Sequence, residues 1–278
     1  MVGVMAAEAR WFAENASKRW TEKVFLVVSA CWILGFGLVV ITEVYKSFDD
    51  LQYLLLGLAV SLPYVLVPAA LGGAPAERSL PLSMRYWVKA NVWVAAITYV
   101  GNYFWTHYFY QVLGAAYSFP VAWQLNDVPV FLYLVTHAYF SFYFTFSTVF
   151  LRRLRTTSLY LSLSPFLRFF AVAAAVLFLS VATAFGETWT IAGVPYYTHN
   201  DKFLMYTVGS LFYATYFIVS FPMYYELDED PRKPKWTIAN AFVNSMGCCM
   251  IVFCLLDIWR ILLEHYGVAT SSVAFINA

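Results

Sequence analysis

Residues 166–188 read FLRFFAVAAAVLFLSVATAFGET, and the run from 169 to 186 inside this stretch carries no charged side chain. A helix needs about 20 mostly apolar residues to cross the hydrocarbon core of a bilayer. Strands of transmembrane barrels are shorter, about 10 residues, and alternate in polarity. The stretch therefore predicts a transmembrane helix.

The rest of the chain repeats this pattern. Of 278 residues, 62% are hydrophobic, 20% are aromatic and only 12% are charged, which is more apolar surface than an ordinary soluble domain can bury. Seven stretches are long and apolar enough to span: 24–42, 51–71, 88–110, 128–150, 166–188, 203–225 and 238–263. The sequence predicts an all-α integral membrane protein, a single bundle of seven transmembrane helices.

Lysine and arginine are distributed unevenly between the two sides of this predicted bundle. Alternate loops hold most of them: Arg10, Lys18, Arg19, Lys23; Arg78, Arg85, Lys89; Arg152, Arg153, Arg155, Arg168; Arg232, Lys233 and Lys235. Short loops rich in positive charge stay in the cytoplasm, so we expect a cytoplasmic N-terminus. This divides the chain into a cytoplasmic interfacial segment (1–23), the seven-helix domain (24–263) and a short non-cytoplasmic tail (264–278).

The basic residues are interpreted as one rim that faces lipid headgroups, not as a nucleic-acid surface. The stretch from Glu8 to Trp20 mixes aromatic and charged residues, and it predicts an interfacial helix on the cytoplasmic leaflet. The triplet Asn15-Ala16-Ser17 falls on that side, so we expect no glycan there. The four cysteines form no Cys-x-x-Cys pair and have no histidine beside them, so neither a disulfide framework nor a metal site is expected.

Ionisable residues at membrane depth are costly and are candidate functional groups. Four stand out: His107, His137, Glu187 and Asp257. Each has a plainer interpretation. Asp257 can pair with Arg260 three residues on, His107 can anchor at the interface, and Glu187 can cap a helix end in water. His137 has no obvious partner in its own helix, although buried histidines often serve only as structural hydrogen-bonding groups.

Asn91, Thr98 and Asn102 lie along one stripe of the third predicted helix, with Trp105 close to it. These polar side chains either form hydrogen bonds between helices or line a polar pocket. Aromatic residues are dense in 99–110 and 139–146, including Tyr103 and Tyr143. Such rings suit a rigid polycyclic ligand or a transient cation, and they are equally compatible with ordinary packing.

Several segments resemble cycloeucalenol cycloisomerases, in order and over nearly the whole chain. They are Ser17-Lys18-Arg19-Trp20; 85–91 (RYWVKAN); 99–109 (YVGNYFWTHYF); Thr136-His137; 151–155 (LRRLR); Gly186-Glu187-Thr188; Pro195-Tyr196-Tyr197; 216–223 (YFIVSFPM); and 256–260 (LDIWR). The most specific of these is the aromatic run from Tyr99 to Phe109.

The resemblance implies an intramolecular lyase that opens the 9,19-cyclopropane ring of a sterol such as cycloeucalenol and gives obtusifoliol, with an 8,9 double bond. This isomerisation needs no cofactor. Burial disfavours the charged form of a carboxyl group, so a buried Glu187 or Asp257 can keep a proton and donate it, with His137 as base or relay and His107 nearby. Trp105, Tyr103 and Tyr143 would stabilise the cation, and Asn102 would hold the 3-hydroxyl.

Two other classes compete with the enzyme. A sterol-binding or transport membrane protein would need the aromatic pocket but no acid. A seven-helix receptor or retinal protein is disfavoured, because 238–263 contains no lysine for a Schiff base and the sixth loop is too short for an obvious signalling platform. The expected partners are a cyclopropyl sterol and the lipid bilayer, without an obligate protein partner. The membrane is the endoplasmic reticulum for a eukaryotic chain and the inner membrane for a bacterial one.

Overall fold

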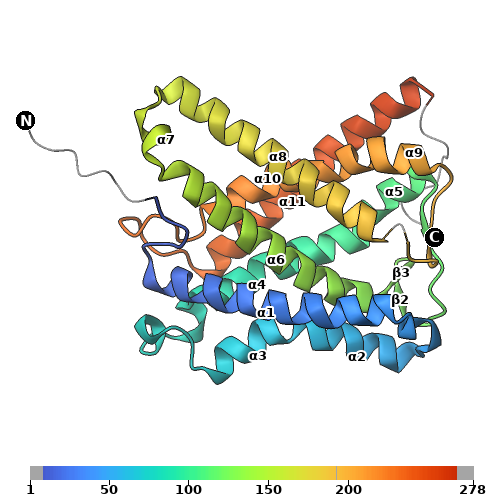
Figure 1. Cartoon of the computed structure of the whole chain (residues 1–278), viewed down its shortest axis with the longest axis horizontal. Helices are drawn as coiled ribbons and strands as arrows, with labels where there is room; N and C mark the ends of the chain where they lie inside the picture. The colour runs from blue at the N-terminus through green and yellow to red at the C-terminus, as the bar shows by residue number, and fades with distance from the viewer. Residues whose placement is uncertain (1–8, 192, 268–278) are drawn as a thin grey trace, which may run out of the picture.

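Long helices run side by side through the computed structural model, which describes residues 9–191 and 193–267 (Figure 1). The helices are α1 (Ala16–Ile41), α2 (Asp50–Ser61), α3 (Pro63–Ala70), α4 (Tyr86–Val100), α5 (Thr106–Leu113), α6 (Val130–Arg155), α7 (Ser158–Ser162), α8 (Pro165–Ile191), α9 (Lys202–Leu204), α10 (Ser210–Tyr225) and α11 (Ile238–His265). Two π-helical segments are η4 (Gly101–Trp105) and η5 (Met205–Gly209), and three 3-10 turns are η1 (Val44–Ser47), η2 (Pro75–Glu77) and η3 (Leu82–Met84).

Five helical runs within the described residues are long and apolar enough to cross a bilayer: α1, α6, α8, the run Lys202–Tyr225 that joins α9, η5 and α10, and α11. The pair α2 and α3 makes a sixth if it is taken as one span bent by 47°. Pro63 lies at this bend, where it lacks the backbone N–H that would continue α2. The prediction of a mostly helical, multi-pass membrane protein is confirmed.

The predicted span 88–110 corresponds to α4, η4 and α5, which follow one another without a break. The π-helical segment η4 divides this run, so its α-helical parts have only 15 and 8 residues. A span count of seven therefore stays a prediction, as does the orientation of the N-terminus. π-helical turns are rare and frequently occur at functional sites.

The ends of successive helices alternate between the two ends of the bundle (Figure 1). One end, here called the basic end, carries residues 9–15 and the loops 71–85, 156–164 and 226–237. The other end, called the opposite end, carries two small antiparallel pairs of strands. β1 (Ala116–Tyr117) pairs with β4 (Tyr197–Thr198), and β2 (Gln124–Leu125) pairs with β3 (Val128–Pro129). The first pair ties the α5–α6 connection to the α8–α9 connection.

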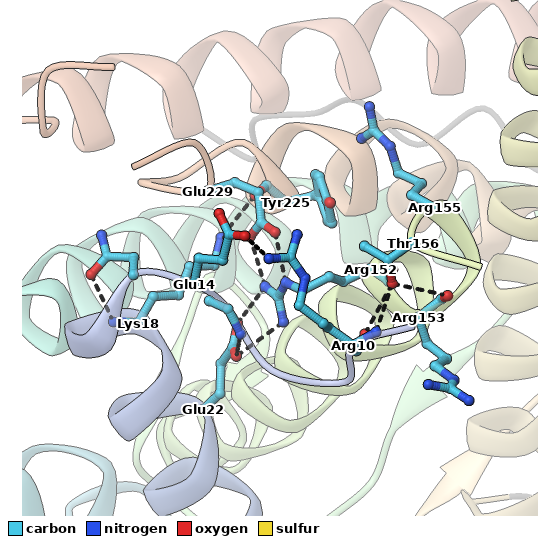
Figure 2. A network of polar contacts seen from close by, with 12 residues as sticks. Arg10, Glu14, Lys18, Glu22, Arg152, Arg153, Arg155, Thr156, Tyr225 and Glu229 are labelled. Atoms are coloured by element: carbon cyan, nitrogen blue, oxygen red, sulfur yellow. Dashed lines mark hydrogen bonds and ion pairs between the residues drawn. The ribbon is translucent and has the colours of Figure 1, made fainter. Parts of the chain in front are cut away.

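A buried ion-pair network holds the basic end together (Figure 2). Arg152 of α6 forms two hydrogen bonds to Glu22 of α1, of 2.7 and 3.0 Å. It also forms two of 2.6 Å to Glu229, which follows α10. Lys18 reaches Glu229 at 2.9 Å and is fully buried. A separate buried pair joins Lys89 to Asp228.

These contacts correct the interpretation of the basic residues as a rim that only faces lipid headgroups. Lys18, Lys89 and Arg152 lie inside the bundle and are paired with acids from other segments. A buried charge needs a partner because removal from water costs several kcal/mol. The pairs therefore fix the positions of α1, α4, α6 and the loop 226–237 relative to one another.

The predicted interfacial helix over Glu8 to Trp20 is wrong for residues 9–15, which have no helical structure. The polar network explains this, because the carbonyl oxygen of Trp11 accepts a hydrogen bond from Arg152 and the amide of Ala13 donates one to Glu22. Helix α1 begins only at Ala16, where the Asn15 side chain caps it. At the other end of the chain, α11 extends to His265, and most of the predicted tail lies outside the described residues.

Candidate active site

Among the acids predicted from the sequence, Glu187 of α8 is partly buried and contacts a neighbouring helix. Its Oε2 atom accepts a hydrogen bond of 2.8 Å from the hydroxyl of Tyr213 on α10. Tyr143 of α6 lies beside the same carboxyl group. The carboxyl group therefore lies where three helices meet. This geometry differs from the interpretation of Glu187 as a helix cap in water.

Glu187 lies near the end of α8, which finishes at Ile191 on the side of the bundle that carries the strand pair β1–β4. Its neighbour Thr188 accepts a bond of 3.4 Å from Ser210, at the start of α10. Tyr143 lies near the middle of α6, and Tyr213 lies near the middle of the run Lys202–Tyr225. The two tyrosines therefore reach the carboxyl group from the side nearer the centre of the bundle.

Aromatic rings surround the two tyrosines. The Phe217 ring lies 5.1 Å from that of Tyr213 and 5.6 Å from those of Tyr143 and Phe140. Tyr216 lies 4.9 Å from Tyr213. Rings at these separations form edge-to-face and tilted pairs, whose faces carry partial negative charge. The surroundings of Glu187 can therefore stabilise a cation without a second ionised group.

Trp105 extends this aromatic cluster into the π-helical segment η4. Its ring lies 4.4 Å from Tyr216 and is fully buried. Its indole N–H has no hydrogen-bond partner among the described residues. A buried donor without a partner is rare and costs free energy unless water or a ligand satisfies it. Trp105 therefore combines an aromatic face beside the cluster with a free donor.

A glycine brings the second π-helical segment close to α5. A Cβ atom at Gly209, in η5, would approach the Cδ1 atom of Leu113 to 2.8 Å. Only glycine allows this packing without a shift of Leu113. The close approach packs η5, which leads into α10, against α5, which follows Trp105.

His137 belongs to a second polar cluster. Its Nε2 atom lies 3.0 Å from the side-chain oxygen of Asn91 on α4. The amide nitrogen of Asn91 donates to the backbone carbonyls of Tyr64 and Trp87, at 3.0 and 2.8 Å, so its oxygen is the acceptor. Nε2 of His137 must then carry the hydrogen and donate it. The imidazole is thus engaged in holding α6 against α3 and α4.

The structure does not bring His137 and Glu187 together. His137 and Tyr143 are six residues apart on α6, so they point about 120° away from each other around the helix axis. Tyr143 faces α8 and α10, whereas His137 faces Asn91 and the ring of Tyr64, at a centroid distance of 6.4 Å. The predicted acid and the predicted base therefore lie on different sides of α6.

The other predicted acid–base residues also lie apart from Glu187. Asp257 forms an ion pair with Arg260, at 2.8 Å, and its side chain is 44% exposed. This matches the plainer interpretation of Asp257. Nε2 of His107 lies 3.1 Å from the backbone oxygen of Asn126, a contact that fastens a loop at the opposite end.

The predicted substrate-binding residues divide into two groups. Tyr143 and Trp105 lie in the aromatic cluster. Tyr103 stacks instead on Tyr99, at 5.5 Å, and Tyr99 is 50% exposed on the outer surface. Asn102 is buried, donates to the Thr98 carbonyl at 3.0 Å and accepts a long bond of 3.4 Å from Thr136.

Sequence reasoning missed Tyr213 and the buried ion pairs. Tyr213, Tyr216 and Phe217 are three or four residues apart, a spacing that indicates a shared helix face but not which acid it meets. The available signal for the ion pairs was that the acids Glu22 and Glu229 lie close in sequence to the basic residues. Among the described residues, no group of three or more His, Cys, Asp and Glu side chains is placed to hold a metal ion.

Comparison with known proteins shows a clear similarity to a curated enzyme. Cycloeucalenol cycloisomerase of Arabidopsis thaliana is 46% identical to this chain over 254 residues, which is 91% of this chain and 89% of the relative. No family model and no solved structure matches the chain.

Proposed function

The chain belongs to the cycloeucalenol cycloisomerase family, and from this premise we propose that it opens the 9,19-cyclopropane ring of cycloeucalenol-type sterols. The product would be the 8,9-unsaturated sterol obtusifoliol. One observation supports a chemical role in the bundle more than any other. The carboxyl group of Glu187 accepts a hydrogen bond from Tyr213 and lies beside Tyr143, next to a set of aromatic rings.

In the reaction, the sterol gains one proton and loses another. A proton is added to C19 while the C9–C19 bond breaks, and positive charge develops at the tertiary carbon C9. Loss of the hydrogen on C8 as a proton then forms the 8,9 double bond. Atoms and electrons balance without a redox partner, so side chains alone can supply the chemistry.

Glu187 is the proposed proton donor. After donation, its carboxylate keeps the hydrogen bond from Tyr213 and the contact with Tyr143. Hydrogen bonds to a charged group are worth about 1.5–3 kcal/mol. The two hydroxyls would therefore stabilise the carboxylate that forms as the ring is protonated.

Aromatic faces are proposed to stabilise the charge at C9. Tyr143 and Tyr213 lie beside the carboxyl group, Phe217 contacts both of their rings, and Trp105 extends this surface through Tyr216. A desolvated cation over an aromatic face gains about 2 kcal/mol. Asn102 is the proposed partner of the sterol 3-hydroxyl, since its long bond to Thr136 leaves the amide oxygen weakly engaged.

The bilayer is the proposed route for the substrate, which is itself a membrane lipid. The proposed arrangement has seven spans with the N-terminus in the cytoplasm, supported by the alternating helix ends and the concentration of basic residues at one end. For a eukaryotic chain the membrane would be that of the endoplasmic reticulum, and for a bacterial chain the inner membrane.

Feeding of a defined sterol tests the activity. The intact chain is expressed in yeast, which supplies no cyclopropyl sterol, and cycloeucalenol is added. We expect obtusifoliol by gas chromatography with mass detection only in cells that carry the chain. Sterol bound to the membrane-inserted protein without any product would instead indicate a binding or transport protein.

A further inference from the structure

We propose that Glu187 carries both proton transfers, so that the proton taken from C8 returns to C19 of a following substrate without exchange with bulk water. The inference rests on the proposed function and adds the identity of the base. It assigns the two steps to one carboxyl group and leaves His137 a structural role.

The first argument is that the other acid–base residues predicted from the sequence have partners away from Glu187. The carboxyl group of Glu187 accepts from Tyr213, and the nearest rings to that tyrosine are those of Tyr216 and Phe217. Of the two histidines not predicted from the sequence, His199 lies in the α8–α9 connection beside the ring of Tyr197, at a centroid distance of 6.3 Å, and His265 is the last residue of α11. His137 is turned towards α4 and donates to Asn91. Asp257 is held by Arg260, and His107 contacts the carbonyl of Asn126.

The chemistry of the substrate is the second argument. C19 and C8 are both bonded to C9, so the site of proton addition and the site of proton loss are close neighbours. A carboxyl group has two oxygens, and the carboxylate formed by donation of a proton is itself a base. The group that protonates C19 is therefore already beside the hydrogen that must leave C8.

Proton balance is the third argument. If the acid and the base were separate groups, each turnover would leave the base protonated and the acid deprotonated. A path for proton transfer from the base back to the acid would then be needed. His137 and Tyr143 point to different sides of α6, and their partners lie on different helices. A single carboxyl group regains its proton at the end of each turnover and needs no such path.

The tyrosines make a quantitative test possible. Tyr213 donates to the carboxyl group and Tyr143 lies beside it, so a proton that arrives from C8 can mix with the hydroxyl protons. Replacement of one hydroxyl, as in Tyr213→Phe, makes this pool of protons smaller.

The experiment uses cycloeucalenol deuterated at C8, with the full-length protein in membranes and ordinary water. Deuterium in the C19 methyl group of the product is measured by mass spectrometry and deuterium NMR. We expect C19 deuterium to rise with successive turnovers, and to rise sooner in Tyr213→Phe. Product that forms at a normal rate with no deuterium at C19 overturns the proposal while leaving the isomerase activity intact.

His137→Gln is the discriminating variant, because glutamine can still donate to Asn91 but cannot accept a proton from carbon. We expect its product to carry the same C19 deuterium fraction as the wild type. A folded His137→Gln protein that forms no product, or product without the label, would assign the second transfer to His137. Failure of the wild type to form obtusifoliol would instead reject the proposed function.

Discussion

The hydroxyl of Tyr213 donates a 2.8 Å hydrogen bond to the Oε2 atom of Glu187, and this bond joins α10 to α8. With Tyr143 beside it, the bond places a carboxyl group where three helices meet, among aromatic rings. The arrangement supplies a proton donor, stabilisation of its conjugate base and a surface for a cation in one location.

Glu187→Gln should lower kcat by about 10²–10⁴-fold, because glutamine keeps the hydrogen-bonding shape but has no acidic proton. Product formation from cycloeucalenol in isolated membranes measures this. Glu43→Gln is the matched control, since the Glu43 side chain is 61% exposed and forms a surface ion pair with Lys46. Equal activity of the two variants would remove Glu187 from the mechanism.

Tyr143→Phe and Tyr213→Phe should each reduce kcat by roughly 10–100-fold, the loss expected for one hydrogen bond to a charged group. KM should change little, because the aromatic ring is kept. The double variant should lose less than the product of the two single losses, since both hydroxyls serve the same carboxylate. A rise in KM at constant kcat would indicate a binding role instead.

Arg152→Met should destabilise the protein by about 3–5 kcal/mol, because Glu22 and Glu229 would be left buried without their main partner. Thermal unfolding in detergent measures this as a lower midpoint temperature. Arg232→Met is the control, because the Arg232 side chain is 87% exposed and pairs with Asp230 at the surface. Equal midpoints would show that the network adds nothing to stability.

Glu229 should make stability depend on pH in the acidic range. Burial opposes its ionisation, but Lys18 and Arg152 outweigh burial and lower the pKa of Glu229 from 4.5 to about 2. A lowered pKa in the folded state stabilises the protein above pH 4.5, and this contribution is lost as the pH falls through about 2. The difference in midpoint temperature between wild type and Glu229→Gln should therefore shrink as the pH falls from 5 towards 2. A constant difference would contradict the assignment.

The two ends of the bundle should lie on opposite sides of the membrane. Single cysteines at Arg232, in the loop 226–237, and at Lys46, in η1, place a thiol at each end. In sealed vesicles a membrane-impermeant maleimide should label one of these positions and not the other, and a cytoplasmic N-terminus places position 232 on the cytoplasmic side. The unsubstituted chain is the control for labelling of the native cysteines. Labelling of both positions from one side would contradict the placement of the two ends of the bundle on opposite sides of the membrane.

The sequence alone determined the class of the protein and the places of its long helices, because apolar length is a local property that each segment carries without its neighbours. It also pointed to the family through motifs such as 99–109, and to Glu187, His137 and Tyr143 as candidates. It misjudged the basic residues, since charge counting treats Arg152 as a surface group, whereas its partner Glu22 is 130 residues away.

Only the tertiary structure decided which polar groups meet. Glu187 and Tyr213 are 26 residues apart, and their contact depends on the rotation and depth of α8 and α10. Those are set by side-chain packing between helices, such as the close approach of Gly209 to Leu113, and not by any pattern inside one segment. The same packing turned His137 towards Asn91 and away from the acid, because a helix presents residues six apart on different faces.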